Sequence, residues 1–155
     1  MQSLEFERDP LILLNDVARL MRTKFDQRAR THGMTRAQWV ILARLSRQPG
    51  LSQNEMAAIC EVEPITVGRL IDRLEMRGFV ERRSDPTDRR IRRLHLLAAA
   101  QPVLDEISRY REELSDALLH GVDARERDRL VDALLQIKNN LNAEAALVPQ
   151  LAAGG

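Results

Sequence analysis

The chain has 155 residues, of which 44% are hydrophobic and only 3% aromatic, so it can form one compact domain with an aliphatic core. It has no run of about 18 apolar residues and no basic-then-apolar signal pattern at its N-terminus, so we expect neither a membrane span nor export. A single cysteine excludes an internal disulfide and fits a reducing cytoplasm, where we expect the protein to act.

Two helices are predicted before residue 50. Asp9-Pro10 begins the first, because aspartate caps a helix well and proline suits the first helical position, and Gly33 ends it. Thr35–Gln38 has the spacing of a capping box and begins the second helix, which Pro49-Gly50 ends.

A helix-turn-helix is predicted next. Ser52–Glu55 is another capping box and opens a short helix. The turn Glu61–Glu63 separates this helix from a longer one that starts at Pro64 and ends at Gly78. A short helix, a tight turn and a longer helix are typical of a helix-turn-helix.

The longer helix has two different faces. Its apolar face consists of Val67, Leu70, Ile71 and Leu74. Thr66, Arg69 and Arg73 recur at spacings of three and four on another face. A recognition helix needs this division, because one face packs on its own domain while the other offers donors to base edges and phosphates.

The N-terminal end of this helix is where recognition helices meet bases, and here it presents Pro64, Ile65 and Thr66. Their apolar groups can contact a thymine methyl. The alternative is a solvated helix face, on which the two arginines pair with the nearby acids Asp72 and Glu75.

A basic β-hairpin is predicted from Gly78 to Leu97, with turn residues at Ser84–Asp88. Residues 77–95 carry seven arginines against three acidic residues, a balance of +4 in a chain whose total is +1. An arginine-rich tip can project into a groove of nucleic acid, whereas the alternative is a solvated sheet edge blunted by charge. The position directly after a two-faced helix favours the groove-binding tip.

Further helices are predicted over Ala98–His120 and, after a capping box at Asp123–Glu126, through the rest of the chain. Apolar residues of the last helix recur at Leu130, Leu134, Ile137, Leu141 and Val148. Such an apolar face of a helix has to pack against another surface. Pairing with the same helices of a second copy would give a homodimer suited to half-sites about 10 base pairs apart. The alternative is that these helices fold back on their own domain.

The segment RLIDRLEMRGFVERRSDPTDRRIRRLHL and its lead-in LSQNEMAAICEVEPITVGRLIDRLE resemble the MarR family of bacterial transcription regulators, and the SlyA-like branch in particular. The resemblance implies a mainly α fold with a small β-wing, in which residues 1–155 form a single MarR-type domain. Residues 35–97 would form a winged helix-turn-helix DNA-binding lobe. Residues 9–32 and 99–148 would be dimerisation helices.

The resemblance implies a homodimeric transcription regulator, acting as a repressor, that binds double-stranded DNA at a pseudo-palindromic operator. DNA contacts are implied at Pro64, Ile65, Thr66, Arg69 and Arg73 of the recognition helix and at Arg89 and Arg90 of the wing, one of which would enter the minor groove. Asp88 is implied as a structural brace that holds a wing arginine in place. The alternative is a winged-helix module that binds protein or RNA without an operator, although such a module needs no arginines on both surfaces.

Relatives often bind small aromatic carboxylates or phenolic compounds that release them from DNA. By position, Arg19, Trp39 and Arg69 could line such a pocket here, with an arginine pairing the carboxylate and the indole covering the ring. The alternative places Trp39 in the core of the second helix and Arg19 in a surface ion pair.

Several residues fit less readily. Glu61 stands where many relatives have glycine, and a left-handed conformation there would cost about 1–2 kcal/mol. Cys60 lies on an apolar helix, which favours core packing over a redox switch. His32, His95 and His120 lack the spacing of metal ligands, and the chain has no catalytic or cofactor-binding motif, so we expect neither a metal, a cofactor nor an enzyme.

Overall fold

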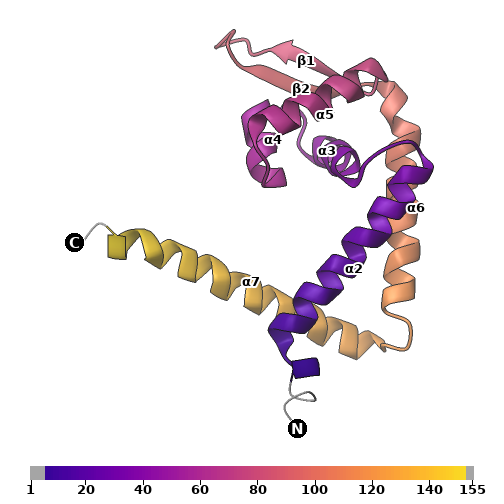
Figure 1. Ribbon diagram of the computed structural model, residues 1–155, viewed down its shortest axis with the longest axis vertical. Coiled ribbons are helices and arrows are strands. Elements are labelled where there is room, and N and C mark those ends of the chain that lie inside the picture. Colours follow the sequence, from indigo (N-terminus) through magenta and orange to yellow (C-terminus); the bar gives the residue numbers. More distant parts are fainter. Residues whose placement is uncertain (1–5, 153–155) are drawn as a thin grey trace. The chain divides into compact units, whose positions relative to one another are not determined.

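The computed structural model describes residues 6–152, with side chains described as far as residue 144 (Figure 1). Its elements are α2 (Pro10–Thr31), α3 (Arg36–Arg47), α4 (Gln53–Cys60), α5 (Pro64–Met76), β1 (Val80–Ser84), β2 (Arg92–Leu96), η1 (Ala98–Ala100), α6 (Gln101–Leu118) and α7 (Ala124–Ala152). The chain divides into two compact units between Arg111 and Glu112. Over the described range, no helix is both long and apolar enough to cross a membrane.

The helices begin where the capping residues predict. The carboxylate of Asp9 accepts the backbone N–H of Leu11 at 2.8 Å, and Pro10 is the first residue of α2. Capping boxes are formed by Thr35 with Gln38, by Ser52 with Glu55 and by Asp123 with Glu126. The helix expected from Ala98 instead begins as a short 3-10 turn before α6, and Val148 lies beyond the described side chains.

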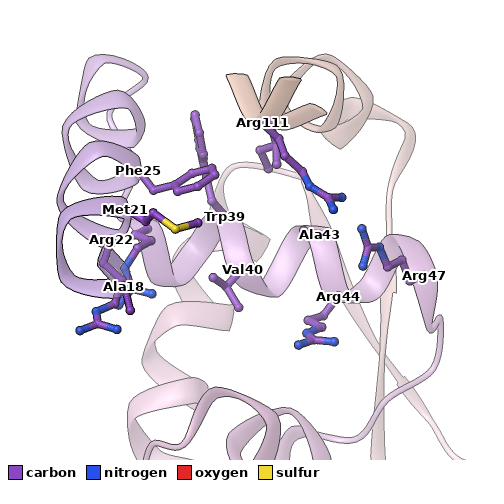
Figure 2. Close-up of a pocket in the computed structure, with 12 residues that line it drawn as sticks. Ala18, Met21, Arg22, Phe25, Trp39, Val40, Ala43, Arg44, Arg47 and Arg111 are labelled. Atoms are coloured by element: carbon purple, nitrogen blue, oxygen red, sulfur yellow. The ribbon is translucent and has the colours of Figure 1, made fainter. Parts of the chain in front are cut away.

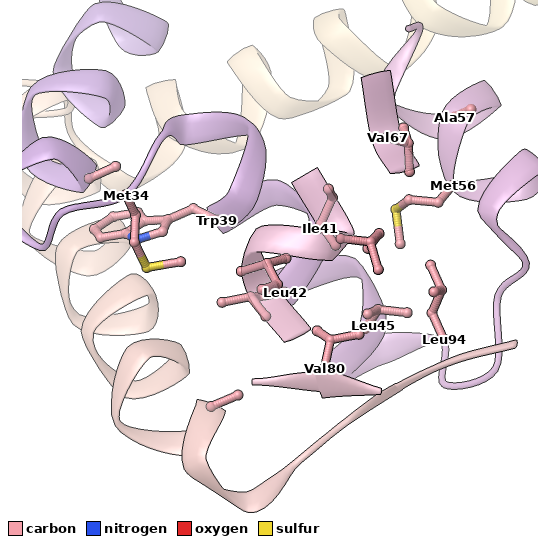
Figure 3. Close-up of a cluster of buried hydrophobic side chains, with 14 residues drawn as sticks. Met34, Trp39, Ile41, Leu42, Leu45, Met56, Ala57, Val67, Val80 and Leu94 are labelled. Carbon is pink, nitrogen blue, oxygen red and sulfur yellow. The ribbon is translucent and has the colours of Figure 1, made fainter. Parts of the chain in front are cut away.

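Helix α3 lies at the centre of the hydrophobic core. It contacts α2, α4, α5 and β2, and its core residues are Trp39, Ile41, Leu42 and Leu45. In Figure 3, Ile41 and Leu45 lie among side chains from the helix-turn-helix and the wing, namely Met56, Val67, Val80 and Leu94, while Trp39 lies beside Met34. Because the wing strands add buried residues to this core, the hairpin is part of the folded lobe and not a free arm.

Strands β1 and β2 form a two-stranded antiparallel sheet in which Val80 pairs with Leu96 and Arg82 with Leu94. The segment after α3 joins it: the N–H of Gly50 donates to the carbonyl of Leu94, and the N–H of Leu94 donates to that of Leu51, both at 2.9 Å. The predicted fold class, mainly α with a small β-wing, is therefore confirmed.

A buried carboxylate joins α2 to α6. Glu106 is only 6% exposed and accepts Arg28 Nε at 2.7 Å and Arg109 Nη1 at 2.8 Å, while His32 Nε2 lies 3.1 Å away. The hydrogen bond from Arg28 holds the pKa of Glu106 below its usual range. At the end of α5, Arg77 donates to the backbone carbonyl of His32. An ion pair with α6 and a hydrogen bond from Arg77 thus hold the end of α2 against both neighbours.

The turn of the helix-turn-helix carries backbone strain. Glu61 has φ 54° and ψ 41°, and it is the one non-glycine residue with positive φ among those described. Its Cβ is close to the following carbonyl in this left-handed conformation, which costs about 1–2 kcal/mol. The left-handed conformation that we expected to be costly at Glu61 is therefore present.

We expect Glu61→Gly to raise the free energy of unfolding by about 1 kcal/mol, because glycine adopts this conformation without the Cβ clash. Glu61→Ala removes the same charge but keeps the Cβ, so its stability should stay near that of the unaltered protein. Urea denaturation of the three proteins measures the difference, and equal stability of the glycine and alanine variants would contradict the strain.

Candidate nucleic-acid interface

Helix α5 separates its apolar and basic faces as its sequence predicts. Val67, Ile71 and Leu74 are fully buried. The residues predicted to contact DNA are all exposed: Pro64, Ile65, Thr66, Arg69 and Arg73. Ile65 is 66% exposed and leaves an aliphatic group on this face. The exposed face therefore offers both apolar groups and donors.

The arginines of α5 and the wing fall into two sets. Arg69, Arg73, Arg89 and Arg90 are exposed, and their guanidinium groups have no hydrogen bond or ion pair with any other described residue. The arginines of the second set bind acids, carbonyls or a hydroxyl group within the winged lobe. The first set therefore keeps all of its donors for an external anion or base.

Arg93 belongs to the second set. Its Nε donates to Asp85 Oδ2 at 2.8 Å, and its Nη1 donates to Glu55 Oε2 at 3.0 Å and to the carbonyl of Gly50 at 3.3 Å. The hydrogen bond with Asp85 raises the pKa of Arg93. The pKa of Glu55 is lowered, first by the backbone N–H of Ser52. This contact fixes β2 to the start of α4.

Asp85 organises the tip of the wing. It is 8% exposed and accepts the backbone N–H of Thr87 at 2.8 Å, the hydroxyl of Thr87 at 2.6 Å and the N–H of Asp88 at 3.0 Å. The hydroxyl of Thr87, followed by Arg93, holds the pKa of Asp85 well below its usual range. A carboxylate with this many donors stays ionised and keeps the turn in one shape.

Asp88 differs from the brace that the family resemblance implied. Its carboxylate accepts the backbone N–H of Arg90 at 3.0 Å and binds no guanidinium group of the described residues. Holding an arginine side chain is the role of Asp85 instead. The reason is geometric, since Asp85 directly follows strand β1 and is buried beside Arg93, whereas Asp88 lies in the exposed turn.

Arg82 is also held within the lobe. Its guanidinium group pairs with Asp72 and Glu75, the two acids of α5 that the alternative interpretation paired with Arg69 and Arg73. Local sequence spacing did not predict this pairing, because Arg82 lies in a different element from Asp72 and Glu75. The remaining wing arginines make weaker local contacts, Arg83 with Glu81 and Arg92 with the hydroxyl of Ser84.

A cavity of about 450 Å³ lies between α2, α3 and α6 (Figure 2). Its apolar wall includes Met21, Phe25, Trp39, Val40 and Ile107, and its arginines are Arg22, Arg36, Arg44, Arg47 and Arg111. No acidic residue lines it. In Figure 2 the guanidinium groups of Arg47 and Arg111 are directed toward one another, which places two positive charges on one side of the cavity.

The structure does not bring the three predicted pocket residues together. Trp39 lines the cavity and is also part of the core, at 2% exposure. Arg19 is exposed and pairs with Asp16 at 3.0 Å, as its alternative reading proposed. Arg69 lies on the exposed face of α5. The cavity arginines come from α2, α3 and α6, and only packing of these helices shows which of their arginines converge.

Cys60 and the histidines are of the residue types that take part in redox chemistry and metal binding. Burial raises the pKa of the half-buried Cys60 thiol, which disfavours the reactive thiolate. Within the described chain, no group of three or more histidine, cysteine, aspartate or glutamate residues is placed to hold a metal ion.

A buried α3, a two-faced α5 and a paired hairpin beside it define a winged helix-turn-helix protein of the DNA-binding type. The sequence model of the MarR family matches residues 34–91. The crystal structure of the transcriptional regulator SlyA is similar, with a TM-score of 0.77 and 26% identity over 90% of this chain and 99% of that chain. The chain belongs to the MarR family of transcription regulators, and the SlyA match is compatible with the SlyA-like branch.

Two further solved structures are similar. The transcriptional regulator PA3341 has a TM-score of 0.74 and 31% identity over 84% of this chain and 96% of that chain. A MarR-family regulator from Listeria monocytogenes, solved in complex with a 26mer DNA, has a TM-score of 0.75 and 22% identity over 88% of this chain and 91% of that chain. At this lower identity the likeness concerns the fold alone.

We expect Asp85→Asn to lower stability at neutral pH, because it removes the charge but keeps the shape of the side chain. The folded pKa of Asp85 lies below its unfolded value. Its charged form therefore stabilises fully at neutral pH, and this contribution is lost as the pH falls below about 4.

Urea denaturation from neutral pH down to about pH 3 measures this effect, and the gap between variant and unaltered protein should narrow as the pH falls. A gap that stays constant with pH would contradict the role of the Asp85 charge. Asp88→Asn is the matched control and should lower stability less, since its carboxylate accepts one backbone N–H.

Proposed function

We propose that this protein is a sequence-specific, double-stranded DNA-binding regulator that acts as a homodimeric repressor on a pseudo-palindromic operator. The observation that carries the proposal is the set of four guanidinium groups without partners in the described chain, two on the exposed face of α5 and two at the wing tip. Arg82, Arg83 and Arg93 are bound to acids. The four unpaired groups lie on two separate surfaces that a duplex can contact together.

Helix α5 enters the major groove in this proposal. Pro64, Ile65 and Thr66 meet base edges at its N-terminal end, and Arg69 reads a base while Arg73 contacts the backbone. Arg89 or Arg90 enters the adjacent minor groove, where guanidinium groups are attracted to the negative potential. Phosphate contacts from both elements supply most of the salt-dependent affinity.

Helix α7 supports the homodimer. Leu130, Val131, Leu134, Leu135, Ile137 and Leu141 are all exposed, and no side chain of its described part is buried. A helix of 29 residues with this many uncovered apolar groups needs a partner surface. A second copy supplies one by symmetry and also supplies the second recognition helix that a palindromic site requires.

The cavity beside α3 is the proposed effector site. Its aromatic and aliphatic wall suits a ring, and the convergent Arg47 and Arg111 suit a carboxylate, so the expected ligand class is a small aromatic carboxylate. An effector bound there lowers DNA affinity if it binds the DNA-free arrangement of the helices more tightly than the DNA-bound one.

DNA binding is tested by fluorescence anisotropy on the protein's own upstream intergenic DNA and on scrambled DNA, across a salt series. Sedimentation should give twice the 17.7 kDa chain mass. Preference for the upstream DNA supports the regulator, whereas equal binding to both would favour a winged-helix module without an operator, and a clean monomer would contradict the dimer.

We expect Arg89→Ala and Arg90→Ala to weaken binding to every sequence and to make its salt dependence shallower. Arg69→Ala should in addition relax base preference, by about 1–3 kcal/mol for a lost bidentate contact. Arg83→Ala is the matched control, because it removes the same charge from an arginine that is paired with Glu81. Unchanged affinity in all three test variants would contradict the docking proposed here.

Effector binding can be followed directly, because Trp39 is the only tryptophan of the chain and lines the cavity. Titration with benzoate should change the tryptophan fluorescence in a saturable way and lower DNA affinity. Arg47→Ala and Arg111→Ala should weaken this titration, whereas Arg19→Ala, outside the cavity, should not. A fluorescence change that survives loss of both cavity arginines would contradict a carboxylate site.

A further inference from the structure

Arg82 contacts the wing, the short helix and the recognition helix from one position. It lies in β1, and its side chain is 21% exposed. Its Nη2 lies 2.8 Å from Asp72 Oδ1 and 3.1 Å from the carbonyl of Gly68, and its Nη1 pairs with Glu75. Its backbone N–H also donates to Glu75, at 3.0 Å. One residue of the wing thus holds three successive turns of α5.

The same guanidinium group reaches the crossing of α4 and α5. Arg82 Nη2 lies 3.4 Å from Gln53 Oε1, and Gln53 Nε2 donates to the carbonyl of Pro64 at 3.2 Å. The two helices meet closely here, since a Cβ on Gly68 would lie 2.9 Å from Gln53 Nε2. Arg82, Gln53 and the backbone of α5 therefore form one hydrogen-bonded joint, which we call the Arg82 joint.

We propose that Arg82 is a positioning residue for DNA recognition, which fixes α5 against the wing and keeps Arg69 unpaired by holding Asp72. This inference rests on the proposed DNA-binding function. Asp72 lies three residues after Arg69, so the two are neighbours on the helix surface and can pair when Asp72 is free. With Arg82 in place, Asp72 is engaged at 2.8 Å and Arg69 has no partner within the described chain.

Arg82 supports DNA binding by positioning α5, and not by contacting a phosphate itself. Its two terminal nitrogens already bind two carboxylates, one carbonyl and one amide oxygen. A phosphate contact would require these charge-assisted bonds to break. Loss of Arg82 is expected to release Asp72 and Glu75 as two uncompensated negative charges on the helix that faces DNA.

The test compares Arg82→Ala with Arg83→Ala, which removes an adjacent arginine of the same charge that is paired only with Glu81. Operator and scrambled affinities are measured across a salt series. We expect Arg82→Ala to weaken operator binding more than tenfold and to reduce base preference as Arg69→Ala does. Arg82→Lys should recover little, because a single ammonium cannot bind all four partners.

Asp72→Asn provides the readout that a purely structural role would not give. Added to Arg82→Ala, it removes the carboxylate that would pair with Arg69. The double variant should therefore bind the operator at least threefold more tightly than Arg82→Ala alone. The proposal is overturned if Arg82→Ala behaves as a lost phosphate contact, with a shallower salt dependence, unchanged base preference and no recovery on adding Asp72→Asn.

Folding and function are separated by two controls. If Arg82→Ala does not fold, Glu75→Gln weakens the same joint while keeping a hydrogen-bond acceptor. It should also lower base preference, and an unchanged base preference in that variant would overturn the proposal.

If the unaltered protein shows no preference for its upstream DNA, the proposed function fails. Hydrogen exchange of the α5 amides then still tests the joint, since Arg82→Ala should speed it and Arg83→Ala should not.

Discussion

Pairing between arginines and carboxylates inside the winged lobe is the interaction on which the proposed DNA surface depends. Asp85 and Glu55 hold Arg93, while Asp72 and Glu75 hold Arg82. These pairs attach both wing strands to the helix-turn-helix, and removing one partner would leave an uncompensated, partly buried charge. The same pairs engage Asp72 and Glu75 of α5, so that Arg69 and Arg73 on the outer face of this helix keep their donors for the proposed DNA contacts.

The apolar core provides the second constraint and joins the two proposed sites. Helix α3 packs against the wing and both helices of the helix-turn-helix, and its Trp39 also forms a wall of the cavity. Protein cores are close-packed, so a ligand that moves Trp39 has to move its neighbours as well. Such a ligand alters DNA binding only by the difference between its affinities for the two arrangements.

Local sequence signals were sufficient to predict the helix starts and the two faces of α5. Helix starts depend on residues two or three positions apart, such as Ser52 with Glu55, and the structure forms these capping boxes as predicted. The two faces of α5 follow from helical periodicity, which places Val67, Ile71 and Leu74 inside. The strain at Glu61 was expected from the family resemblance, which implied glycine there, and glycine is the residue that left-handed backbone favours.

The partners of the charged side chains could not be predicted from local sequence, because they are residues distant in the chain. Arg93 meets a carboxylate 38 residues away and Arg82 an amide 29 residues away, and no local pattern distinguishes these arginines from Arg89 and Arg90. The choice of Asp85 over Asp88 as the partner of a wing arginine, and of Arg47 and Arg111 over Arg19 in the cavity, has the same origin. Composition placed a surplus of positive charge on the hairpin, and periodicity placed a basic face on α5. Only tertiary packing decided which of those charges are neutralised, because an ion pair depends on distance in space and not on distance along the chain.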